Sequence, residues 1–265
     1  MSVTKHISFT FIAVKIYFFT ENTLDMRKNA IVFGATSGIG KELARLLVAD
    51  NYHVVVTGRR LEKLQEIQSQ NVEAYTIKQH DVTDLESTAV FFQEIRAAFT
   101  TIDLIVHSSG VGEPNYELEW EKDLATLQTN IYGAVKIYQL AYNLFKKQGF
   151  GHLVSITSVA SIRGNRHVPA YFASKAFQSS YLESLWMKAS RSKKAKISIT
   201  NILPGFVDTK MAMGDTFWKA SLEKATAQIY TAIKKKKKKA YITKRWRLVA
   251  FVLRIVPARL LVKYM

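Results

Sequence analysis

Tyr171 and Lys175 stand four residues apart, and Ser158 lies thirteen residues before the tyrosine. Residues at i and i+4 of a helix share a face, so the phenol and the ammonium group would lie side by side. A phenol with its ordinary pKa of about 10 transfers protons poorly near neutrality, but a nearby ammonium group favours the phenolate. The pair is therefore suited to moving a proton to or from a substrate.

The serine separates Tyr171 from three similar tyrosines. Four tyrosines are followed by a lysine four positions later, namely Tyr132, Tyr142, Tyr171 and Tyr230. Thirteen residues before the other three stand Glu119, Thr129 and Phe217. Ser155 is sixteen residues from Tyr171 and lacks the required spacing. The combination therefore selects one of the 12 tyrosines in the chain.

A glycine-rich turn lies between a short apolar run and a helical pattern, with the sequence Gly34-Ala35-Thr36-Ser37-Gly38-Ile39-Gly40. Glycines at such a junction let the backbone approach a pyrophosphate, whose charge the helix N-terminus stabilises. A plain tight turn is the alternative, but a strand before it and a helix after it favour a dinucleotide site. The residues that we assign to the cofactor here are Gly34, Thr36, Ser37, Gly38, Ile39 and Gly40.

Two arginines, Arg59 and Arg60, follow the second predicted strand, and no acidic residue occurs between positions 54 and 61. An acidic residue there would bind a ribose 2′-hydroxyl, whereas a guanidinium pairs with a 2′-phosphate. The sequence therefore favours NADP(H) over NAD(H), with Arg59 as the phosphate ligand and Arg60 as the solvated start of the next helix.

Asp81 and Val82 follow the third predicted strand and are placed to meet the adenine. Asp81 could equally cap the helix that follows.

Short β-branched runs alternate with longer helical patterns after residue 26. Strands are expected over 30–33, 53–57, 74–79, 103–107, 152–156 and 197–202, with a short seventh over 240–243. Helices are expected over 41–50, 60–70, 85–99, 119–147 and 171–189. Strands alternating with helices predict an α/β fold, a single Rossmann-type doubly wound parallel sheet with helices on both faces. The ligand crevice of such a sheet lies at the carboxyl ends of its strands.

The motifs of this chain, taken in sequence order, resemble those of the short-chain dehydrogenase/reductase family over about residues 27–232. The motifs are the Gly-x-x-x-Gly-x-Gly turn at 34–40, an Asp-Val pair at 81–82, a turn at 107–110, Asn130, the Ser158/Tyr171/Lys175 set and the segment at 204–209. Each motif alone is weak, but all of them in the same order are highly specific.

The resemblance implies a role for each of four catalytic residues. Tyr171 would protonate a carbonyl oxygen while hydride arrives from the nicotinamide, and Lys175 would lower the pKa of the tyrosine and bind the nicotinamide ribose. Ser158 would hold the substrate oxygen. Asn130 would position a water that continues the proton path past Lys175. The alternative for Asn130 is a solvent-facing asparagine on a helix.

Further cofactor contacts are implied at the ends of the fourth and sixth strands, namely Ser109, Gly110, Pro204, Gly205, Val207 and Thr209. The apolar residues that follow could form a mobile lid over the substrate, because methionine and aromatic side chains make adaptable binding surfaces. They are Met211, Met213, Phe217 and Trp218. The alternatives are that they pack a loop onto the core or face a membrane.

The chain departs from the family pattern at two positions. Phe33 stands where the family usually has threonine before the glycine turn, and His107-Ser108-Ser109-Gly110 replaces the usual Asn-Asn-Ala-Gly. We expect a repacked junction between the two turns, with Phe33 burying apolar area. His107 is expected to be structural rather than a base.

Charge is concentrated at the C-terminal end. The net charge is +17, and the last 32 residues hold twelve Lys/Arg and no acidic residue. The longest apolar run there, 248–253, is too short to span a membrane. Trp246, Phe251 and Tyr264 among arginines suit a membrane interface, although Arg247, Arg254 and Arg259 do not fall on one helical face. An oligomer interface and a solvated charge run are the alternatives.

Other classes of function are disfavoured by composition. The absence of cysteine excludes disulfides, thiolate catalysis and cysteine zinc sites, and no metal site is expected. No nucleic-acid-binding motif accompanies the basic residues, so no nucleic acid partner is expected.

Residues 1–25 lie outside the α/β pattern, and we interpret Met26 as the translation start, with a peripheral membrane anchor as the alternative.

The sequence thus predicts three segments, an N-terminal extension at 1–25, a catalytic domain at 26–233 and a polybasic, apolar tail at 234–265. The expected activity is NADP(H)-dependent interconversion of a ketone or aldehyde and an alcohol. The expected substrate is a lipophilic carbonyl compound of lipid metabolism. We expect a cytoplasmic homodimer or homotetramer, peripheral on the cytoplasmic face of a membrane. The rivals are a cofactor-sensing protein without turnover and a scaffold built around the tail.

Overall fold

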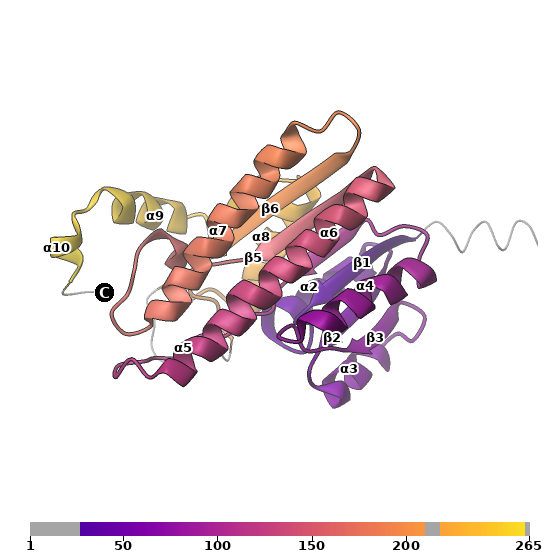
Figure 1. Ribbon diagram of the computed structural model, residues 1–265, viewed down its shortest axis with the longest axis horizontal. Helices are drawn as coiled ribbons and strands as arrows, with labels where there is room; N and C mark the ends of the chain where they lie inside the picture. Colours follow the sequence, from indigo (N-terminus) through magenta and orange to yellow (C-terminus); the bar gives the residue numbers. More distant parts are fainter. Residues whose placement is uncertain (1–26, 210–217, 263–265) are drawn as a thin grey trace, which may run out of the picture.

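Seven parallel strands form one sheet in the order β3-β2-β1-β4-β5-β6-β7. Figure 1 shows the arrangement of the helices around this sheet. The computed structural model describes residues 27–209 and 218–262. The strands are β1 (Lys28–Phe33), β2 (Tyr52–Gly58), β3 (Tyr75–Gln79), β4 (Leu104–His107), β5 (Phe150–Ile156), β6 (Lys196–Pro204) and β7 (Lys239–Ile242). The strand order reverses between β1 and β4, so the predicted doubly wound fold is confirmed.

Helices cover both faces of the sheet. One face packs against α2 (Gly38–Ala49), α3 (Leu61–Gln68) and α8 (Leu222–Lys234). The other packs against α4 (Leu85–Ala98), α6 (Ala134–Gln148) and α7 (Pro169–Ser190). The shorter elements are α5 (Trp120–Leu127), the π-helical η1 (Gln128–Gly133), the 3₁₀ turn η2 (Val159–Ile162), α9 (Trp246–Ile255) and α10 (Ala258–Leu261).

Strand β1 shows why the sheet is apolar on both sides. Ala30 and Val32 face the cluster under α2, whereas Ile31 and Phe33 face the cluster under α4 and α6. Successive side chains of a strand point to opposite faces, so a strand covered by helices on both sides needs an uninterrupted apolar run. The register between β1 and β4 then brings the ends of these two central strands, Phe33 and His107, side by side.

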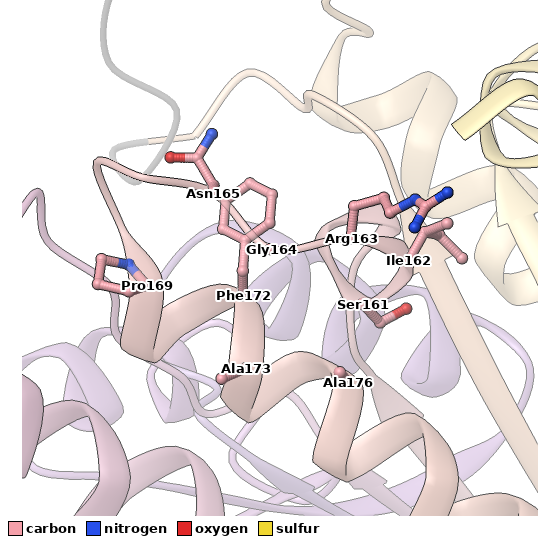
Figure 2. A pocket seen from close by; sticks show the side chains of 9 residues that line it. All are labelled: Ser161, Ile162, Arg163, Gly164, Asn165, Pro169, Phe172, Ala173 and Ala176. Atoms are coloured by element: carbon pink, nitrogen blue, oxygen red, sulfur yellow. The ribbon is translucent and has the colours of Figure 1, made fainter. Parts of the chain in front are cut away.

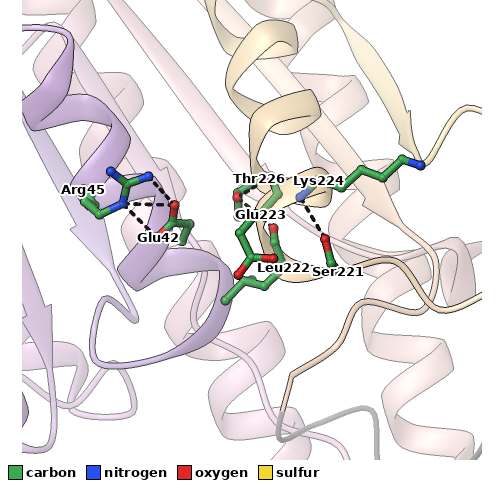
Figure 3. A network of polar contacts seen from close by, with 7 residues as sticks. All are labelled: Glu42, Arg45, Ser221, Leu222, Glu223, Lys224 and Thr226. Carbon is green, nitrogen blue, oxygen red and sulfur yellow. Dashed lines mark hydrogen bonds and ion pairs between the residues drawn. The ribbon is translucent and has the colours of Figure 1, made fainter.

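Local capping fixes where α8 begins beside α2. Figure 3 shows Ser221 at the start of α8, where its hydroxyl accepts a hydrogen bond from the backbone nitrogen of Lys224 at 3.3 Å. On the neighbouring α2, Arg45 forms an ion pair with Glu42 at 2.7 Å. The cap satisfies one of the open amides of α8, as a serine at this position usually does.

The long helix expected over 119–147 is interrupted, which corrects the sequence prediction. It divides into α5, the π-helical η1 and α6. Gly133 lies so close to Val82 that an added Cβ would overlap the Val82 carbonyl, and the Asn130 side chain bonds to the neighbouring chain. Such tertiary contacts stabilise a widened turn that helical periodicity does not reveal. The expected strand over 74–79 begins instead at Tyr75, and the helix expected over 60–70 is α3.

The junction between the two central turns is repacked around aromatic rings. The ring of Phe33 is fully buried, with centroids of Phe91 and Phe92 at 5.3 and 6.0 Å. His107 is also fully buried and shares a polar cluster with Tyr138 and Ser155, whose hydroxyls lie 2.6 Å apart. Burial lowers the pKa of His107 to about 3, so this residue is a neutral part of the core.

The C-terminal segment folds back onto the domain. Strand β7 extends the sheet beside β6, and α9 follows it with Trp246 and Ala250 buried. Arg163 donates hydrogen bonds to the carbonyls of Leu253, Arg254 and Val256 at the end of α9. Within the described residues, no helix combines the length and apolarity needed to cross a bilayer. The expectations for residues 1–25, for Met211, Met213 and Phe217, and for Tyr264 lie outside the described residues.

Candidate active site

The predicted site residues meet at the carboxyl edge of the sheet, where four strands end. The glycine turn follows β1, Ser109 and Gly110 follow β4, Ser158 follows β5, and the segment 205–209 follows β6. Parallel strands deliver these loops to one edge, because all their carboxyl ends point the same way. Figure 1 shows α5 and the start of α7 at this end of the molecule.

The glycine turn has the backbone form that a pyrophosphate site requires. Gly34 and Gly38 have positive φ of 77° and 54°, in the left-handed region that favours glycine. A Cβ on Gly34 would lie 2.7 Å from the backbone nitrogen of Ser109. Helix α2 starts at Gly38, and Ser37 at its N-cap makes no capping side-chain bond to the first amides. These amides suit the binding of a phosphate, so the turn fits the cofactor.

Arg60, rather than Arg59, lies against the glycine turn. Its guanidinium donates hydrogen bonds to the hydroxyls of Thr36 at 2.6 Å and Ser37 at 3.0 Å. Arg59 is exposed, and its backbone carbonyl accepts a hydrogen bond from Gln79 at 2.9 Å. Arg60 is exposed at the N-cap of α3, as expected for a solvated helix start, and it also contacts the glycine turn. No pattern in the chain distinguishes two adjacent arginines, because the backbone path decides which one reaches the turn.

Asp81 and Val82 lie at the end of β3 as expected. The Asp81 carboxylate accepts hydrogen bonds from the backbone nitrogen and hydroxyl of Thr83, at 3.0 and 2.9 Å. Helix α4 is capped instead by Asp84, which accepts from the backbone nitrogen of Ser87. Val82 is nearly buried. Asp81 thus shapes the loop and does not cap the helix.

Asn130 is fully buried, which excludes the solvent-facing alternative. Its amide nitrogen donates to the carbonyl of Val111 at 2.7 Å, and its amide oxygen accepts from the Val111 nitrogen at 2.9 Å. A third bond joins the same amide nitrogen to the hydroxyl of Ser174 at 3.0 Å. Asn130 therefore ties the turn after β4 to the helix that carries Tyr171.

Tyr171, Lys175 and Ser158 come together as their spacing predicts. Tyr171 and Lys175 lie on one face of α7, with the Lys175 ammonium 5.7 Å from the centre of the tyrosine ring. Burial raises the pKa of Tyr171, and a hydrogen bond with Ser158 partly opposes this shift. We expected the ammonium to lower the pKa of the phenol, but burial is the larger effect. A phenol with a raised pKa stays protonated near neutrality and can act as an acid.

Lys175 is buried, which lowers its pKa to about 8. Its ammonium donates to the side-chain oxygen of Gln178 at 3.2 Å and lies 3.4 Å from the carbonyl of Ile156. The amide nitrogen of Gln178 in turn donates to the backbone carbonyl of Asn130 at 2.7 Å. Sequence analysis missed Gln178. Its place three residues after Lys175, on the same helical face, was the signal that could have found it.

The segment after β6 closes the site toward the glycine turn. A methyl group of Thr209 lies 3.4 Å from the Cβ position of Gly38. Val207 is buried and pairs with Ala220 in an isolated bridge. Pro204 ends β6, and Gly205 leaves the space that the Trp246 indole fills, since a Cβ there would overlap the ring. Gly205 therefore has a packing role in addition to the predicted cofactor contact.

A cavity of about 280 Å³ lies between the loop that follows Ser158 and the first turns of α7. Figure 2 shows its lining, which is mostly apolar with Arg163 and Asn165 at the rim. The lining residues are Ser161, Ile162, Arg163, Gly164, Asn165, Pro169, Phe172, Ala173 and Ala176. This cavity borders the elements that carry Ser158 and Tyr171.

Comparison with known proteins agrees with this geometry. The family described as short chain dehydrogenase matches residues 28–220. An uncharacterized oxidoreductase of Myxococcus xanthus (strain DK1622) is 32% identical over 195 residues, covering 72% of this chain and 76% of the relative. An uncharacterized oxidoreductase of Mycobacterium tuberculosis (strain CDC 1551 / Oshkosh) is 30% identical over 194 residues, covering 70% and 75%.

Solved structures share the fold at lower sequence identity. ElxO with NADP bound has a TM-score of 0.74 at 21% identity and covers 82% of this chain and 96% of its own. The 3-ketoacyl-(acyl-carrier-protein) reductase of Brucella melitensis, complexed with NADH, has a TM-score of 0.73 at 17% identity, covering 81% and 96%. The order of motifs, the sheet and the family match agree, and the chain belongs to the short-chain dehydrogenase family of oxidoreductases.

Proposed function

We propose that this chain is an NADP(H)-dependent oxidoreductase that reduces a lipophilic ketone or aldehyde to an alcohol at a membrane surface. The observation that supports it most directly is the meeting of Tyr171, Ser158 and Lys175 beside the turn after β4, which itself packs against Gly34 of the glycine turn. A phenol, a hydroxyl and a buried ammonium group at the carboxyl edge of the sheet form an acid site next to a dinucleotide cradle.

The residues divide the chemistry of carbonyl reduction among themselves. Tyr171 donates its phenolic proton to the carbonyl oxygen, and Ser158 donates a hydrogen bond that stabilises the developing negative charge. A bound reduced nicotinamide supplies the hydride to the carbonyl carbon. Lys175 then stabilises the phenolate that remains on Tyr171. The Tyr171 phenol, whose pKa burial raises, carries its proton near neutrality, as donation to a carbonyl oxygen requires.

The preference for NADP(H) is supported by the arginines of the chain itself. Arg60 lies against Thr36 and Ser37, and Arg59 is next to it. Two guanidinium groups at this edge suit a 2′-phosphate, and no acidic side chain between 54 and 61 would repel it. The structural neighbours differ in their bound cofactor, which is NADP in ElxO and NADH in the Brucella melitensis reductase. The proposed preference therefore rests on the two arginines.

A lipophilic substrate is supported by the apolar lining of the cavity beside Ser158 and by the exposed apolar residues of α9. We place the enzyme in the cytoplasm, peripheral on the cytoplasmic face of a membrane, where anionic lipids gather. We also propose a homodimer or homotetramer through the outer faces of η1 and α7, where Tyr132, Phe177 and Met187 are exposed.

The test is NADPH oxidation by the purified chain against ketones and aldehydes of graded chain length. We expect turnover that rises with chain length and is lost in Tyr171→Phe, which keeps the ring but removes the proton. Retained NADPH fluorescence on binding shows that the variant is folded. Tight NADPH binding without turnover on any carbonyl would instead indicate a cofactor sensor.

A further inference from the structure

The outer surface of α9 and α10 carries an unusual density of exposed apolar side chains. Leu248, Phe251, Val252 and Ile255 follow the i, i+3, i+4, i+7 pattern of one helical face, and each is at least 43% exposed. Leu260 and Val262 continue this surface onto α10 and the residue after it. We call these six residues the α9–α10 apolar face. The opposite side of α9 is anchored by Trp246, which is 3% exposed.

Positive charge flanks this face on its own helices. Arg247 and Arg254 are seven residues apart on α9 and therefore share one flank of the helix, while Arg259 lies on the separate α10. The sequence contains no acidic residue after Glu223. Arg247, Arg254 and Arg259 were expected not to share one helical face. The reason is that they belong to two helices. Within α9 the pattern is amphipathic, with Trp246 and Ala250 buried on the side away from the exposed apolar residues.

The apolar face is held rigidly next to the site. Arg163, which lines the cavity, donates hydrogen bonds to the carbonyls of Leu253, Arg254 and Val256 at the end of α9, and Figure 2 shows its guanidinium turned away from the cavity toward the C-terminal segment. Arg166 donates to the carbonyl of Val262 at 2.6 Å. A surface that binds the α9–α10 apolar face would therefore lie beside the cavity wall.

We propose that the α9–α10 apolar face docks on an anionic lipid surface. Charge complementarity selects this occupant, because a second copy of the chain would bring like-charged arginine flanks together, whereas anionic headgroups would neutralise them. Apolar side chains then enter the boundary between headgroups and acyl chains. The inference rests on the proposed function, which it deepens by naming the surface from which a lipophilic carbonyl would reach the cavity.

The test is sedimentation of the full chain with vesicles of phosphatidylcholine, with and without phosphatidylserine. We expect binding only to the anionic vesicles, weakened by salt, and at least about tenfold weaker in Leu248→Glu/Phe251→Glu, because two carboxylates would have to enter the interface. Val72→Glu/Val90→Glu is the matched control, since these exposed valines lie elsewhere on the surface. This control should bind as the wild type does.

Two results would overturn the docking proposal. One is equal vesicle binding by both double variants, or none by the wild type. The other is a concentration-dependent dimer that Leu248→Glu/Phe251→Glu dissociates while vesicle binding is absent, since a second copy would then cover the face. Reduction of a short, water-soluble carbonyl without vesicles is measured in parallel, so that loss of docking and loss of the catalytic function are told apart.

A second inference concerns Gln178, whose amide bridges two parts of the site. Its oxygen accepts from the Lys175 ammonium at 3.2 Å, and its nitrogen donates to the Asn130 carbonyl at 2.7 Å. Each end of the amide thus faces the partner that suits it, an acceptor facing a cation and a donor facing a carbonyl. Gln178 and Asn130 are fully buried, so these bonds form away from water.

We infer that Gln178 is a positioning residue that acts through Lys175. Among the described residues, only the Gln178 oxygen and the Ile156 carbonyl accept a hydrogen bond from this ammonium group, and no carboxylate is near enough to do so. The side chain at 178 therefore decides how strongly the protonated lysine is held and where it points. Its link to Asn130 fixes the same group to the π-helical turn.

Two substitutions of Gln178 with opposite effects on the charge of Lys175 distinguish a positioning role from a purely structural one. Gln178→Leu removes the acceptor and should move the alkaline limb of the pH profile of kcat to lower pH. Gln178→Glu places a carboxylate beside the ammonium and should move that limb to higher pH, each by about one unit. Gln139→Leu on α6 is the matched control, because Gln139 is exposed and bonds to Tyr181.

Thermal unfolding and NADPH binding show that each variant is folded. A residue that only fills space would change kcat or stability without moving the two profiles in opposite directions. Shifts of the same sign, or no shift in either variant, would overturn the inference. This result is independent of membrane docking, because the assay uses a soluble carbonyl.

Discussion

At the scale of single residues, the site depends on two titratable groups, the half-buried Tyr171 and the buried Lys175, whose pKa values respond to burial in opposite ways. Burial disfavours charge, so it raises the pKa of the Tyr171 phenol and lowers the pKa of the Lys175 ammonium. The neutral phenol can then give a proton, and the lysine remains charged only up to a pH close to its lowered pKa. Burial therefore keeps the Tyr171 phenol protonated and limits the pH range over which Lys175 is charged.

The pH dependence of reduction follows from Lys175. Its pKa is lowered to about 8, so the ammonium is present below that pH and is lost as the pH rises through it. We expect kcat for reduction to be level near neutrality and to fall about tenfold per unit above pH 8. Stopped-time assays of NADPH oxidation across the alkaline range measure this. A level kcat up to pH 10 would contradict it.

Cofactor preference is the second prediction at this scale. Arg60→Ala should weaken binding of NADPH by roughly ten- to a hundredfold, since a charge-assisted bond to a phosphate contributes about 1.5–3 kcal/mol. Binding of NADH, which lacks the 2′-phosphate, should change little. Fluorescence titration with both cofactors measures the difference, and Arg59→Ala is the comparison variant. An equal loss for NADPH and NADH would show that Arg60 only supports the turn through Thr36 and Ser37.

Spacing located some of these residues and not others. Tyr171 and Lys175 were predicted to lie side by side because a helix turns a sequence interval into a distance, whereas Ser158, which follows β5, was predicted by resemblance. Arg60 and Gln178 were not, because their contacts depend on side-chain paths across different elements. Asn130 was predicted by resemblance, yet its bonds to Val111 became visible only with the fold.

At the scale of elements, close backbone contacts explain why the helix after β4 is not continuous. Periodicity predicted one helix over 119–147, since the apolar pattern runs through the π-helical η1 without a break. Gly133 allows the chain to approach Val82, a long-range contact that no local pattern encodes. The strands, by contrast, were located to within a few residues, because buried parallel strands are uninterrupted apolar runs.

A glycine pair tests the packing of α9 on the segment after β6. Gly205→Ala should destabilise the protein by about 1–3 kcal/mol, because the added methyl would overlap the Trp246 indole. Gly164→Ala is the control, since nothing lies within 4 Å of the Cβ position there. Thermal and chemical unfolding compare the two. Equal stability of the variants would mean that α9 shifts to accommodate the methyl group.

At the scale of the whole molecule, the sheet and most of its covering helices were predictable from the strand–helix alternation, but α8, between β6 and β7, was not among the expected helices. The architecture of the tail was not predictable. The sequence of the tail shows basic and apolar residues but does not show which of them are buried. Strand β7 decides this, because it brings Trp246 into contact with Gly205. Of the three aromatic residues that suggested a membrane interface, Trp246 is buried, Phe251 is exposed, and Tyr264 lies outside the described residues.

Two buried histidines make global stability sensitive to acid. Burial lowers the pKa of His107 and His152 to about 3, whereas their unfolded value is 6.5. Between these values the unfolded chain binds more protons, so stability is full above pH 6.5 and is lost as the pH falls, by up to about 1.4 kcal/mol per unit for each histidine. Urea unfolding at several pH values measures the slope.

The control for this prediction is His152→Gln, which replaces an imidazole bonded to Thr200 at 2.8 Å with an uncharged amide. The variant should unfold with a smaller dependence on pH than the wild type between pH 6.5 and 4. A slope unchanged by the substitution would indicate that other groups, such as the paired carboxylates, govern acid unfolding.

The contact between Trp246 and Gly205 also gives the protein an optical reporter of its own. The indole is 3% exposed, whereas Trp120 and Trp218 are 62% and 46% exposed, so an aqueous quencher would silence those two first. The emission that survives arises from the half-buried Trp186 on α7 and from Trp246, beside the strand end that leads into Val207 and Thr209. Its colour and lifetime would register the arrival of a ligand or a lipid surface without any attached dye.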